Sequence, residues 1–242
     1  RKVTMISRQS DRIPDDFLLI REDLACHQEI KVQILAKKLS ASSPRILLYP
    51  FHMLRQMYHL ATSKVVILDG YCIVASLVPH KPETTLIQIW HATAAIKKFG
   101  WQIVGKPSGS SQTVASAMHM HENYDIVLAP SERTAQAYCE AFRVDPGRIR
   151  LMGLPHLTML TETDPQTSQQ KSQQKSQQIA REYGLDPDKK VILYLPTFRE
   201  GKVVDLQGLI DAFDFDKYQL IAKIHPIDRL PGKDPLVIYP QR

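Results

Sequence analysis

The fold class that the sequence predicts is α/β, with parallel strands covered by helices in two regions along the chain. Short apolar runs rich in Val, Ile and Leu alternate with longer amphipathic stretches, which is the pattern of a parallel sheet with helices on its faces. A polar segment at 161–178 interrupts this alternation, and a fresh apolar run follows it. A chain of 242 residues suits one large domain or two modest ones.

The first region supplies six strands and three helices. We expect strands at residues 3–7, 30–35, 65–69, 85–90, 126–129 and 148–151. We expect helices at residues 14–27, 50–61 and 132–142. Pro50 suits a first helical position, where no N–H partner is needed, and Ser131 is a good N-cap. Residues 94–100 offer a further helix start after the fourth strand.

The polar segment 161–178 leads into the second region. It repeats Ser-Gln-Gln three times at a period of four residues. This pattern permits an exposed helix running into 179–183, with a solvated linker as the alternative. Gly184 and Pro187 end such a helix. Beyond them we expect a strand at 191–195, a helix at 206–213, a strand at 219–224 and a last apolar piece at 236–239.

The order of these elements predicts how the chain divides into domains. Two or three strands in the second region leave a sheet edge unpaired and the sheet half covered, so we expect that domain to be incomplete. The predicted parts are a first domain at 1–157, a linker or exposed helix at 158–178, and a partial second domain at 179–242.

The composition indicates anionic partners rather than nucleic acid. The formal net charge of +6 is a moderate basic bias, which suits anionic substrates and anionic lipid surfaces, with solubility alone as the alternative. No apolar run reaches the roughly 18–20 residues that span a bilayer, so we expect any membrane contact to be peripheral. Three widely spaced cysteines without a CxxC pair predict buried thiols rather than disulfides or structural zinc.

The helix expected at 50–61 has two interpretations. Residues 45–64 combine Arg55 and Lys64 with many aromatic and aliphatic side chains. A basic, amphipathic helix of this kind can lie on an anionic membrane. An ordinary helix that faces the core is the alternative.

Polar residues follow three of the predicted strands at their carboxyl ends. His91 follows the strand at 85–90, Thr197 and Arg199 follow the strand at 191–195, and His225 follows the strand at 219–224. Ligands of open parallel sheets bind at the carboxyl ends of the strands. The sequence therefore predicts one candidate histidine in each half of the chain. Asp69 also lies at a strand end, where it can shape an acceptor site.

Each of these side chains has a chemical role and a structural alternative. The pKa of an ordinary histidine lies near 6.5, so His91 can act as a general base; a hydrogen-bonded histidine at a strand end is the alternative. His225 can donate a hydrogen bond to a phosphate, or it lies in a turn. Arg199 can pair with a diphosphate through its planar guanidinium, or it is an exposed loop residue.

Weaker signals surround the first histidine. Lys97 can contact a substrate, although a solvated face is the commoner explanation for a loop lysine. His119, His121 and Glu122 have the spacing HxHE but lack a clear third ligand, so no metal site is predicted. The chain contains no Walker A loop and no GxGxxG motif.

The motifs together resemble the CDP-glycerol:poly(glycerophosphate) glycerophosphotransferase family. Residues 88–93 and 97–100 resemble the family's WHGT segment and the K-x-x-G that follows it. Residues 194–199 resemble its Y-x-P-T-F-R segment, and residues 223–226 resemble its K-x-H-P segment. Two further segments, 127–131 and 153–155, fall in matching order between them. Each motif is weak alone, but their shared order and spacing is fairly specific.

The resemblance implies a GT-B-like fold of two Rossmann-like domains, with no cofactor. It implies a cytoplasmic enzyme at the inner face of the cell membrane, which moves glycerol phosphate or ribitol phosphate from a CDP-activated donor to a lipid-linked polyprenyl diphosphate acceptor in teichoic acid synthesis. It implies that His91 deprotonates the acceptor hydroxyl. The other site residues that we carry over are Thr197, Arg199 and His225 for the donor phosphates, and Asp69, Thr93 and Lys97 for the acceptor side.

The chain also departs from the family pattern. Ala92 stands where WHGT has Gly, Ala94 replaces a usual Pro, and His156 replaces an Arg after G-x-P. A D-Y-S-S-type segment, which the family uses to help bind the donor, is absent from the 242 residues, so we expect this chain not to bind the nucleotide fully. The alternatives are a GT-B glycosyltransferase or sugar-nucleotide epimerase, and a non-catalytic polymer-binding scaffold.

Overall fold

The computed structural model describes residues 1–38, 47–155, 157, 165–197, 205–224 and 232–240. Contacts between residues divide the chain into two compact units, Arg1–Glu162 and Thr163–Arg242. Each unit contains its own sheet, and the two are described separately below.

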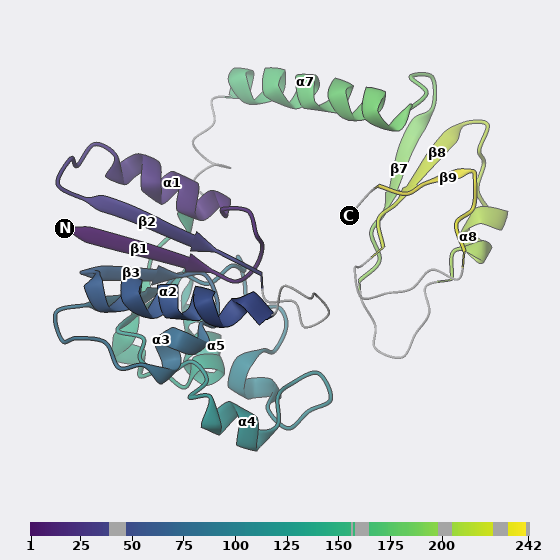
Figure 1. Cartoon of the computed structure of the whole chain (residues 1–242). Coiled ribbons are helices and arrows are strands. Elements are labelled where there is room, and N and C mark those ends of the chain that lie inside the picture. The colour runs from purple at the N-terminus through teal and green to yellow at the C-terminus, as the bar shows by residue number, and fades with distance from the viewer. Residues whose placement is uncertain (39–46, 156, 158–164, 198–204, 225–231, 241–242) are drawn as a thin grey trace. The chain divides into compact units, whose positions relative to one another are not determined.

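The first unit is built on a six-stranded sheet whose neighbouring strands all run parallel (Figure 1). The strand order is β2-β1-β3-β4-β5-β6. The α/β class predicted from the alternation of apolar and amphipathic segments is therefore confirmed. The strands are β1 (Lys2–Ser7), β2 (Lys31–Ala36), β3 (Val65–Leu68), β4 (Thr85–Gln88), β5 (Ile126–Ala129) and β6 (Ile149–Leu151).

Side chains from both faces of the central strands are buried. On β3, Val66 and Leu68 pack into one hydrophobic cluster with residues of the helices on that side, whereas Val65 and Ile67 pack into another. Successive side chains of a strand point to opposite faces. A strand in the middle of a doubly covered sheet therefore reads as a continuous apolar run, as this one does.

In the part of this unit that the structure describes, α-helices and short 3₁₀ helices accompany the sheet. Ser131 caps the helix α5, because its Oγ accepts a hydrogen bond from the Thr134 N–H at 3.2 Å, as expected for an N-cap. The short helices α3 and α4 were not predicted, since neither is long enough to show a helical period. The elements are α1 (Asp15–Leu24), α2 (Tyr49–Thr62), α3 (Ile73–Leu77), α4 (Gln112–Ala117), α5 (Glu132–Phe142), η2 (Gly100–Ile103) and η3 (Pro146–Arg148).

The prediction of a helix that starts within 94–100 is wrong, and so is the predicted end of the fourth strand. Residues 94–99 are irregular, because the Phe99 ring stacks on Trp90 at 4.7 Å and Phe99 itself is extended. Gly100 has φ +55° and packs against the Ala141 carbonyl too closely for a Cβ. The strand β4 stops at Gln88 rather than at residue 90, because Trp90 has φ +53° and cannot continue a strand.

The helix α1 ends three residues earlier than predicted, which changes the place of one cysteine. Cys26 lies beyond the end of α1 and is exposed, so its expected burial is wrong. Cys72 is buried as expected, and Cys139 is intermediate.

A cluster of aromatic rings joins α5 to the loop that follows β4. The Phe142 ring lies 5.1 Å from Trp90, 5.4 Å from Phe99 and 5.1 Å from Tyr138, measured between centroids. The Tyr138 hydroxyl donates a hydrogen bond to the Ala92 carbonyl at 3.3 Å. The loop that carries residues 90–99 is therefore anchored to a helix through packed rings, although it has no regular structure of its own.

The second unit has a three-stranded parallel sheet in the order β7-β8-β9. Leu220 of the central strand packs with Leu206, Ala222 and Val237. The edge strand β7 exposes Val191, Ile192 and Leu193. The elements are α7 (Pro165–Tyr183), β7 (Lys190–Tyr194), α8 (Gln207–Asp211), β8 (Tyr218–Ala222) and β9 (Val237–Ile238).

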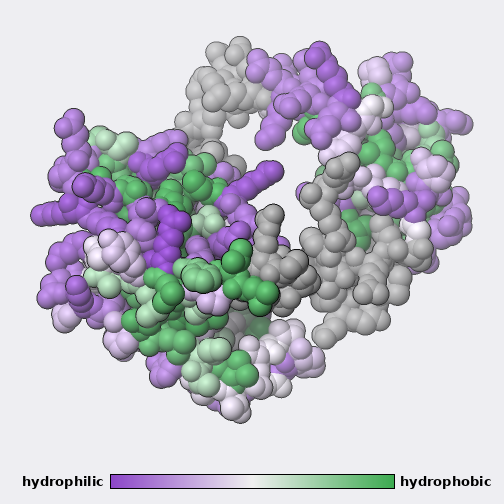
Figure 2. All heavy atoms as spheres, in the orientation of Figure 1, coloured by the Kyte–Doolittle hydropathy of each residue, from purple (hydrophilic) through white to green (hydrophobic). Residues whose placement is uncertain are grey.

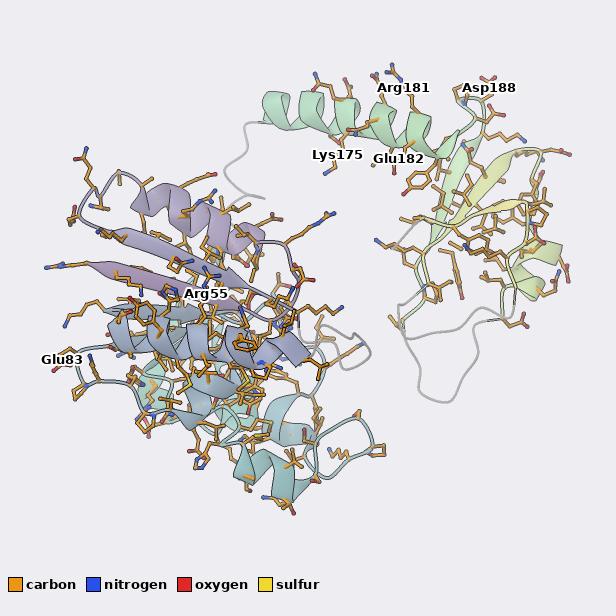
Figure 3. All side chains as sticks on the ribbon, viewed as in Figure 1. Arg55, Glu83, Lys175, Arg181, Glu182 and Asp188 are labelled. Carbon is orange, nitrogen blue, oxygen red and sulfur yellow. The ribbon has the colours of Figure 1, made fainter. Side chains whose placement is uncertain are left out.

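The helix α7 confirms that the Ser-Gln-Gln repeats favour an exposed helix over a solvated linker. Lys175 and Glu182 project from one side of it and Arg181 from the other (Figure 3). Such a helix gains little from tertiary burial, so its stability depends largely on the intrinsic preference of Gln and Lys for helix.

Replacement of Phe142 by Ala tests the role of the aromatic cluster. The side chain is only 1% exposed, so Phe142→Ala is expected to lower the free energy of unfolding by about 3–5 kcal/mol through lost burial and a residual cavity. Urea denaturation measures this change. Ile96→Ala, at a side chain that is 89% exposed, is the matched control and is expected to change stability by less than about 0.5 kcal/mol. A loss below about 1 kcal/mol in Phe142→Ala would show that the cluster does not organise this unit.

Candidate active site

The candidate site lies where the order of strands in the first sheet reverses. The chain runs from β1 outward to β2 and then returns to place β3 on the other side of β1. In open α/β sheets, ligands bind beside the carboxyl ends of strands at such a switch point. Gln9 follows β1, Asp69 follows β3 and His91 follows β4. Three neighbouring strands thus bring these residues to one edge of the sheet.

Two hydrogen-bond contacts orient the imidazole of His91. Its Nδ1 lies 2.8 Å from the backbone carbonyl oxygen of Asp69. A carbonyl oxygen can only accept a hydrogen bond, so Nδ1 carries the proton and donates it to this oxygen. The other ring nitrogen, Nε2, then holds the lone pair. This tautomer is the one that a general base needs.

Gln9 and Gly70 complete the surroundings of the same ring nitrogen. The Gln9 carboxamide lies 3.1 Å from His91 Nδ1. Because Nδ1–H is a donor, the amide serves as a hydrogen-bond partner only when it turns its oxygen toward the ring. A Cβ at Gly70 would lie 2.8 Å from the Gln9 side-chain nitrogen and 3.7 Å from His91 Nδ1. Glycine at position 70 therefore leaves the room that the Gln9 carboxamide occupies.

Gln88 fixes the turn that leads to His91. This fully buried side chain donates to the Gly70 carbonyl at 3.1 Å and accepts from the Trp90 N–H at 2.9 Å. The left-handed backbone of Trp90 is unfavourable for a bulky residue. The Gln88 hydrogen bond and the packing of the indole, whose centroid lies 4.4 Å from the His91 ring, hold it in place. Sequence reasoning assigned roles to neither Gln88 nor Gln9, because both act through contacts between strands.

Asp69 is a buried carboxyl group close to the imidazole. Burial raises the pKa of its carboxyl from 3.8 to about 6, while a hydrogen bond with Ser7 and the nearby His91 oppose this rise. The Asp69 Oδ1 atom has no hydrogen-bond partner among the described residues. Near neutral pH this group therefore carries a weakly compensated negative charge beside the histidine.

Arg8 adds a cation to the same edge, and the sequence did not single it out. Its guanidinium donates to the Tyr71 carbonyl at 3.0 Å and lies over the Tyr71 ring at 5.7 Å. The Arg8 Nε atom is buried without a partner among the described residues. A fixed cation thus stands beside the strand that carries Gln9.

The structure does not bring the other two predicted acceptor-side residues into contact with His91. Thr93 and Lys97 are both exposed in the irregular loop after β4. Neither makes a hydrogen bond or ion pair to any residue that the structure describes. Their roles stay predictions.

The predicted donor side belongs to the second unit. β7 and β8 are adjacent and parallel, with Tyr194 paired to Ala222, so the residues that follow both strands emerge at one edge of that sheet. Thr197 is exposed just beyond β7. Arg199 and His225 lie outside the described residues.

The histidines of the HxHE spacing make local contacts within the fold. His121 is buried, its Nδ1 lies 2.9 Å from the Tyr124 hydroxyl, and burial lowers its pKa to about 3. His119 Nδ1 instead lies 2.7 Å from a Glu122 oxygen. Among the residues that the structure describes, no group of three or more His, Cys, Asp or Glu side chains is arranged to hold a metal ion.

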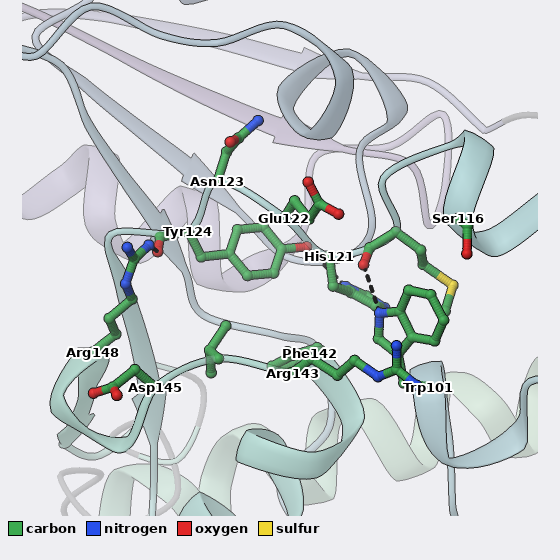
Figure 4. A pocket seen from close by; sticks show the side chains of 12 residues that line it. Trp101, Ser116, His121, Glu122, Asn123, Tyr124, Phe142, Arg143, Asp145 and Arg148 are labelled. Atoms are coloured by element: carbon green, nitrogen blue, oxygen red, sulfur yellow. Dashed lines mark hydrogen bonds between the residues drawn. The ribbon is translucent and has the colours of Figure 1, made fainter.

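A cavity of about 530 Å³ lies beside His121, next to Trp101 and Arg143 (Figure 4). The Trp101 indole donates to the Met120 carbonyl at 2.8 Å, and the Arg143 guanidinium stacks on its ring at 3.7 Å. The polar groups nearest the indole are thus already engaged with one another.

The pH dependence of stability tests the environment of Asp69. Its folded-state pKa is raised, so the stability that the protonated group contributes is present below about pH 4 and is lost as the pH rises through about 6. Asparagine cannot ionise, so Asp69→Asn does not show this loss of stability with rising pH. The free energy of unfolding of the variant, relative to the wild type, is therefore expected to rise by up to about 3 kcal/mol between pH 4 and pH 8.

Urea denaturation across this pH range measures the effect of Asp69→Asn. The control is Asp23→Asn at an exposed position on α1, for which we expect a small difference that does not change with pH. If the difference in unfolding free energy between Asp69→Asn and the wild type is also independent of pH, the pKa of Asp69 is not raised.

Comparison with known proteins identifies relatives along most of the chain. The sequence profile of the family described as CDP-Glycerol:Poly(glycerophosphate) glycerophosphotransferase matches residues 1–232. The teichoic acid ribitol-phosphate primase of Bacillus spizizenii (strain W23) is 30% identical over 236 residues, which cover 94% of this chain and 59% of the primase. The teichoic acid glycerol-phosphate primase of Bacillus subtilis (strain 168) is 27% identical, over 73% of this chain and 45% of that primase.

Solved structures share the fold. The wall teichoic acid polymerase TagF matches with a TM-score of 0.61 and 18% identity, over 98% of this chain and 61% of the polymerase chain. UDP-GlcNAc 2-epimerase from Neisseria meningitidis matches with a TM-score of 0.55 and 13% identity, over 100% of this chain and 73% of the epimerase. The expected GT-B-like α/β fold is thereby confirmed. With its profile matched from residue 1 to residue 232, the chain belongs to the CDP-glycerol:poly(glycerophosphate) glycerophosphotransferase family.

Proposed function

We propose that the whole protein transfers glycerol phosphate or ribitol phosphate from a CDP-activated donor to a lipid-linked acceptor in teichoic acid synthesis. The observation that carries this proposal is the tautomer of His91, whose Nε2 is free to accept a proton at the switch point of the sheet. The names of the relatives, which include ribitol-phosphate and glycerol-phosphate primases, supply the substrate class. One TagF structure was obtained after a soak with CDPG.

The proposed reaction uses the neutral imidazole as a base. His91 Nε2 takes the proton from an acceptor hydroxyl, and the resulting oxygen attacks the β-phosphorus of the donor. A bond forms between that oxygen and the phosphorus, and the bond from the phosphorus to the bridging oxygen breaks, so that CMP leaves. The ring becomes an imidazolium whose charge the Asp69 carboxylate stabilises. Catalysis of phosphoryl transfer depends mainly on positioning and on electrostatic stabilisation of this kind.

The remaining site residues receive proposed roles on either side of the reaction. Thr197, Arg199 and His225 bind the donor phosphates, since a guanidinium and an imidazole N–H are suited to a diphosphate. Thr93 and Lys97 contribute to the acceptor side, in the same loop as the base. The acceptor is a polyprenyl diphosphate that carries the growing polymer.

Loss of His91 tests the proposed base. In the full-length protein, His91→Ala is expected to lower kcat for CMP release from CDP-glycerol or CDP-ribitol by about 10²–10⁴-fold, the usual contribution of a general base. His225→Ala is expected to raise the KM for the donor as well. Release of CMP, followed by chromatography, measures both. His27→Ala, at an exposed histidine beyond α1, is the control and should leave the rate unchanged.

The outcomes of that assay separate the alternatives. Turnover of a UDP-sugar with release of UDP would identify a glycosyltransferase, and acceptor binding without turnover of any donor would identify a scaffold. Full activity in His91→Ala would refute the mechanism proposed here.

We also propose that the protein works at the inner face of the cell membrane through α2. One face of this helix packs inward through Tyr49, Gln56 and Leu60. Packing against the core therefore explains the residues on this face of the helix but not those on the opposite face. The opposite face carries a stripe of apolar side chains, each at least 60% exposed: Phe51, Leu54 and Tyr58. Leu47, which precedes the helix, is also exposed.

This apolar stripe has the chemistry of a membrane-surface helix. Figure 2 shows hydrophobic atoms gathered on the face that carries α2, and Arg55 lies on the same helix (Figure 3). An exposed apolar stripe next to basic residues favours contact with an anionic bilayer. Within the described part of the chain, no helix is both long and apolar enough to cross a bilayer.

Vesicle co-sedimentation tests the α2 surface. The double variant Phe51→Ser with Leu54→Ser is expected to bind vesicles of anionic lipid at least about tenfold more weakly, because each buried apolar side chain is worth about 1.5–3 kcal/mol. Arg55→Gln should weaken binding to anionic vesicles only. The matched control is Ile179→Ser on α7, a partly exposed apolar side chain in the second unit, which should not change binding. The proposal would be contradicted if the double variant binds vesicles as well as the wild type does. It would also be contradicted if binding of the wild type does not depend on the anionic lipid content.

A further inference from the structure

A second cleft lies beside the candidate base, and no role has been assigned to it so far. It has a volume of about 600 Å³ and is formed by residues 94–96 on one side and by the first three turns of α5 on the other. Its polar lining includes Gln102, Arg133 and Gln136. This volume is within the range of sites that hold small ligands.

The cleft lies at the same edge of the sheet as His91. Ala94 lines it and is only three residues from His91, so their Cα atoms are within about 11 Å of each other. Its other wall, α5, begins just after the carboxyl end of β5, the neighbour of β4. The hydrogen bond from Tyr138 to the Ala92 carbonyl ties the two walls together. The wall of the cleft at Ala94 therefore lies within about 11 Å of the candidate base, measured between Cα atoms.

Two side chains in the cleft are available for a ligand. Arg133 and Gln136 are exposed, lie three residues apart on α5, and make no hydrogen bond or ion pair to any described residue. Residues three apart lie on one face of a helix. The carboxylate that lines the cleft is engaged, because Glu140 accepts a hydrogen bond from the Gln102 amide at 2.9 Å. Ser131 is also engaged, with Thr134.

These groups match a phosphate ester that carries hydroxyl groups. The planar guanidinium of Arg133 can bind two phosphate oxygens at once, and a carboxamide can donate to and accept from hydroxyls. Lys97 and Lys98 follow directly after the wall at Ile96 and are exposed. Besides the Glu140 carboxylate, the charged side chains at this cleft are therefore Arg133 in its lining and Lys97 and Lys98 next to it, and its uncharged groups suit a polyol.

We propose that this cleft binds the last polyol phosphate unit of the acceptor chain, with the phosphate on Arg133 and the terminal hydroxyl toward His91. This inference rests on the proposed function and makes it more specific. It identifies Arg133 and Gln136 as acceptor-binding residues, which the sequence motifs do not include. An acceptor that already ends in a polyol phosphate is then preferred over one that ends in a sugar.

Steady-state kinetics of the full-length protein test this assignment. Arg133→Gln is expected to raise the KM for an acceptor that ends in a polyol phosphate by about 10- to 100-fold, the effect of losing a hydrogen bond between charged groups. The KM for the CDP-polyol donor and kcat should stay within about twofold. Arg133→Lys keeps the positive charge but loses the planar guanidinium that binds two phosphate oxygens at once, so its KM for this acceptor should be intermediate. Arg21→Gln, at an exposed position on α1, is the matched control.

Comparison of two acceptors identifies the phosphate that Arg133 binds. With a polyprenyl diphosphate acceptor that lacks the terminal polyol phosphate, Arg133→Gln should have no effect on KM. An equal effect on both acceptors would assign the residue to the lipid diphosphate and overturn the proposal. If Arg133→Gln raises the KM for the donor, Arg133 binds the nucleotide instead. An unchanged KM for the acceptor would also refute the proposal.

A binding experiment separates this inference from the proposed function. Saturation-transfer NMR of the full-length protein with glycerol 3-phosphate as the probe is expected to show binding that Arg133→Gln abolishes and Arg21→Gln retains. This readout does not depend on turnover. If the wild type binds the probe through Arg133 but transfers no polyol phosphate, the proposed reaction alone is refuted. If Arg133→Gln binds the probe as well as the wild type does, the acceptor cleft alone is refuted.

Discussion

The chemistry of the site depends on one hydrogen bond, from His91 Nδ1 to the backbone oxygen of Asp69. This contact decides which ring nitrogen carries a proton, and so whether the imidazole can act as a base. The parallel pairing of β3 with β4 brings the two residues together. Gln88 supports the contact by bonding to Gly70 and Trp90 on either side. The sheet therefore sets the tautomer of the proposed base through main-chain geometry.

The aromatic cluster explains how an irregular loop can hold the proposed base in place. Trp90 occupies an unfavourable left-handed conformation, which costs about 1–3 kcal/mol. Contacts between Phe142, Phe99 and the indole offset this cost. The same packing prevents residues 94–99 from forming a helix and leaves a cleft against α5. Strain at one residue, an irregular loop and a cleft are thus consequences of the same packed rings.

Much of the fold could be predicted from the sequence, because apolar runs in parallel sheets are continuous and easy to locate. The strand at 126–129 and the helix at 132–142 lie where the pattern put them, and the strand predicted at 65–69 ends one residue earlier, at Leu68. The expected end of β4 was wrong, since the left-handed turn at Trp90 depends on the Gln88 side chain, which accepts from the Trp90 N–H and is itself held by the Gly70 carbonyl beyond the neighbouring strand. For the same reason the motif located His91, whereas Gln9, Arg8 and Gln88 could be identified only once neighbouring strands were placed.

The acceptor of the imidazole proton is a main-chain atom, and this affects how the site can change in evolution. Every amino acid carries a carbonyl oxygen, so no single codon change at position 69 can delete the partner of His91 Nδ1. Substitutions there can alter the charge near the ring but leave its tautomer intact. Insertions or deletions in the loop after β3 would move that oxygen away. Loop length between β3 and α3, more than the residue type at position 69, therefore maintains the hydrogen bond of the proposed base.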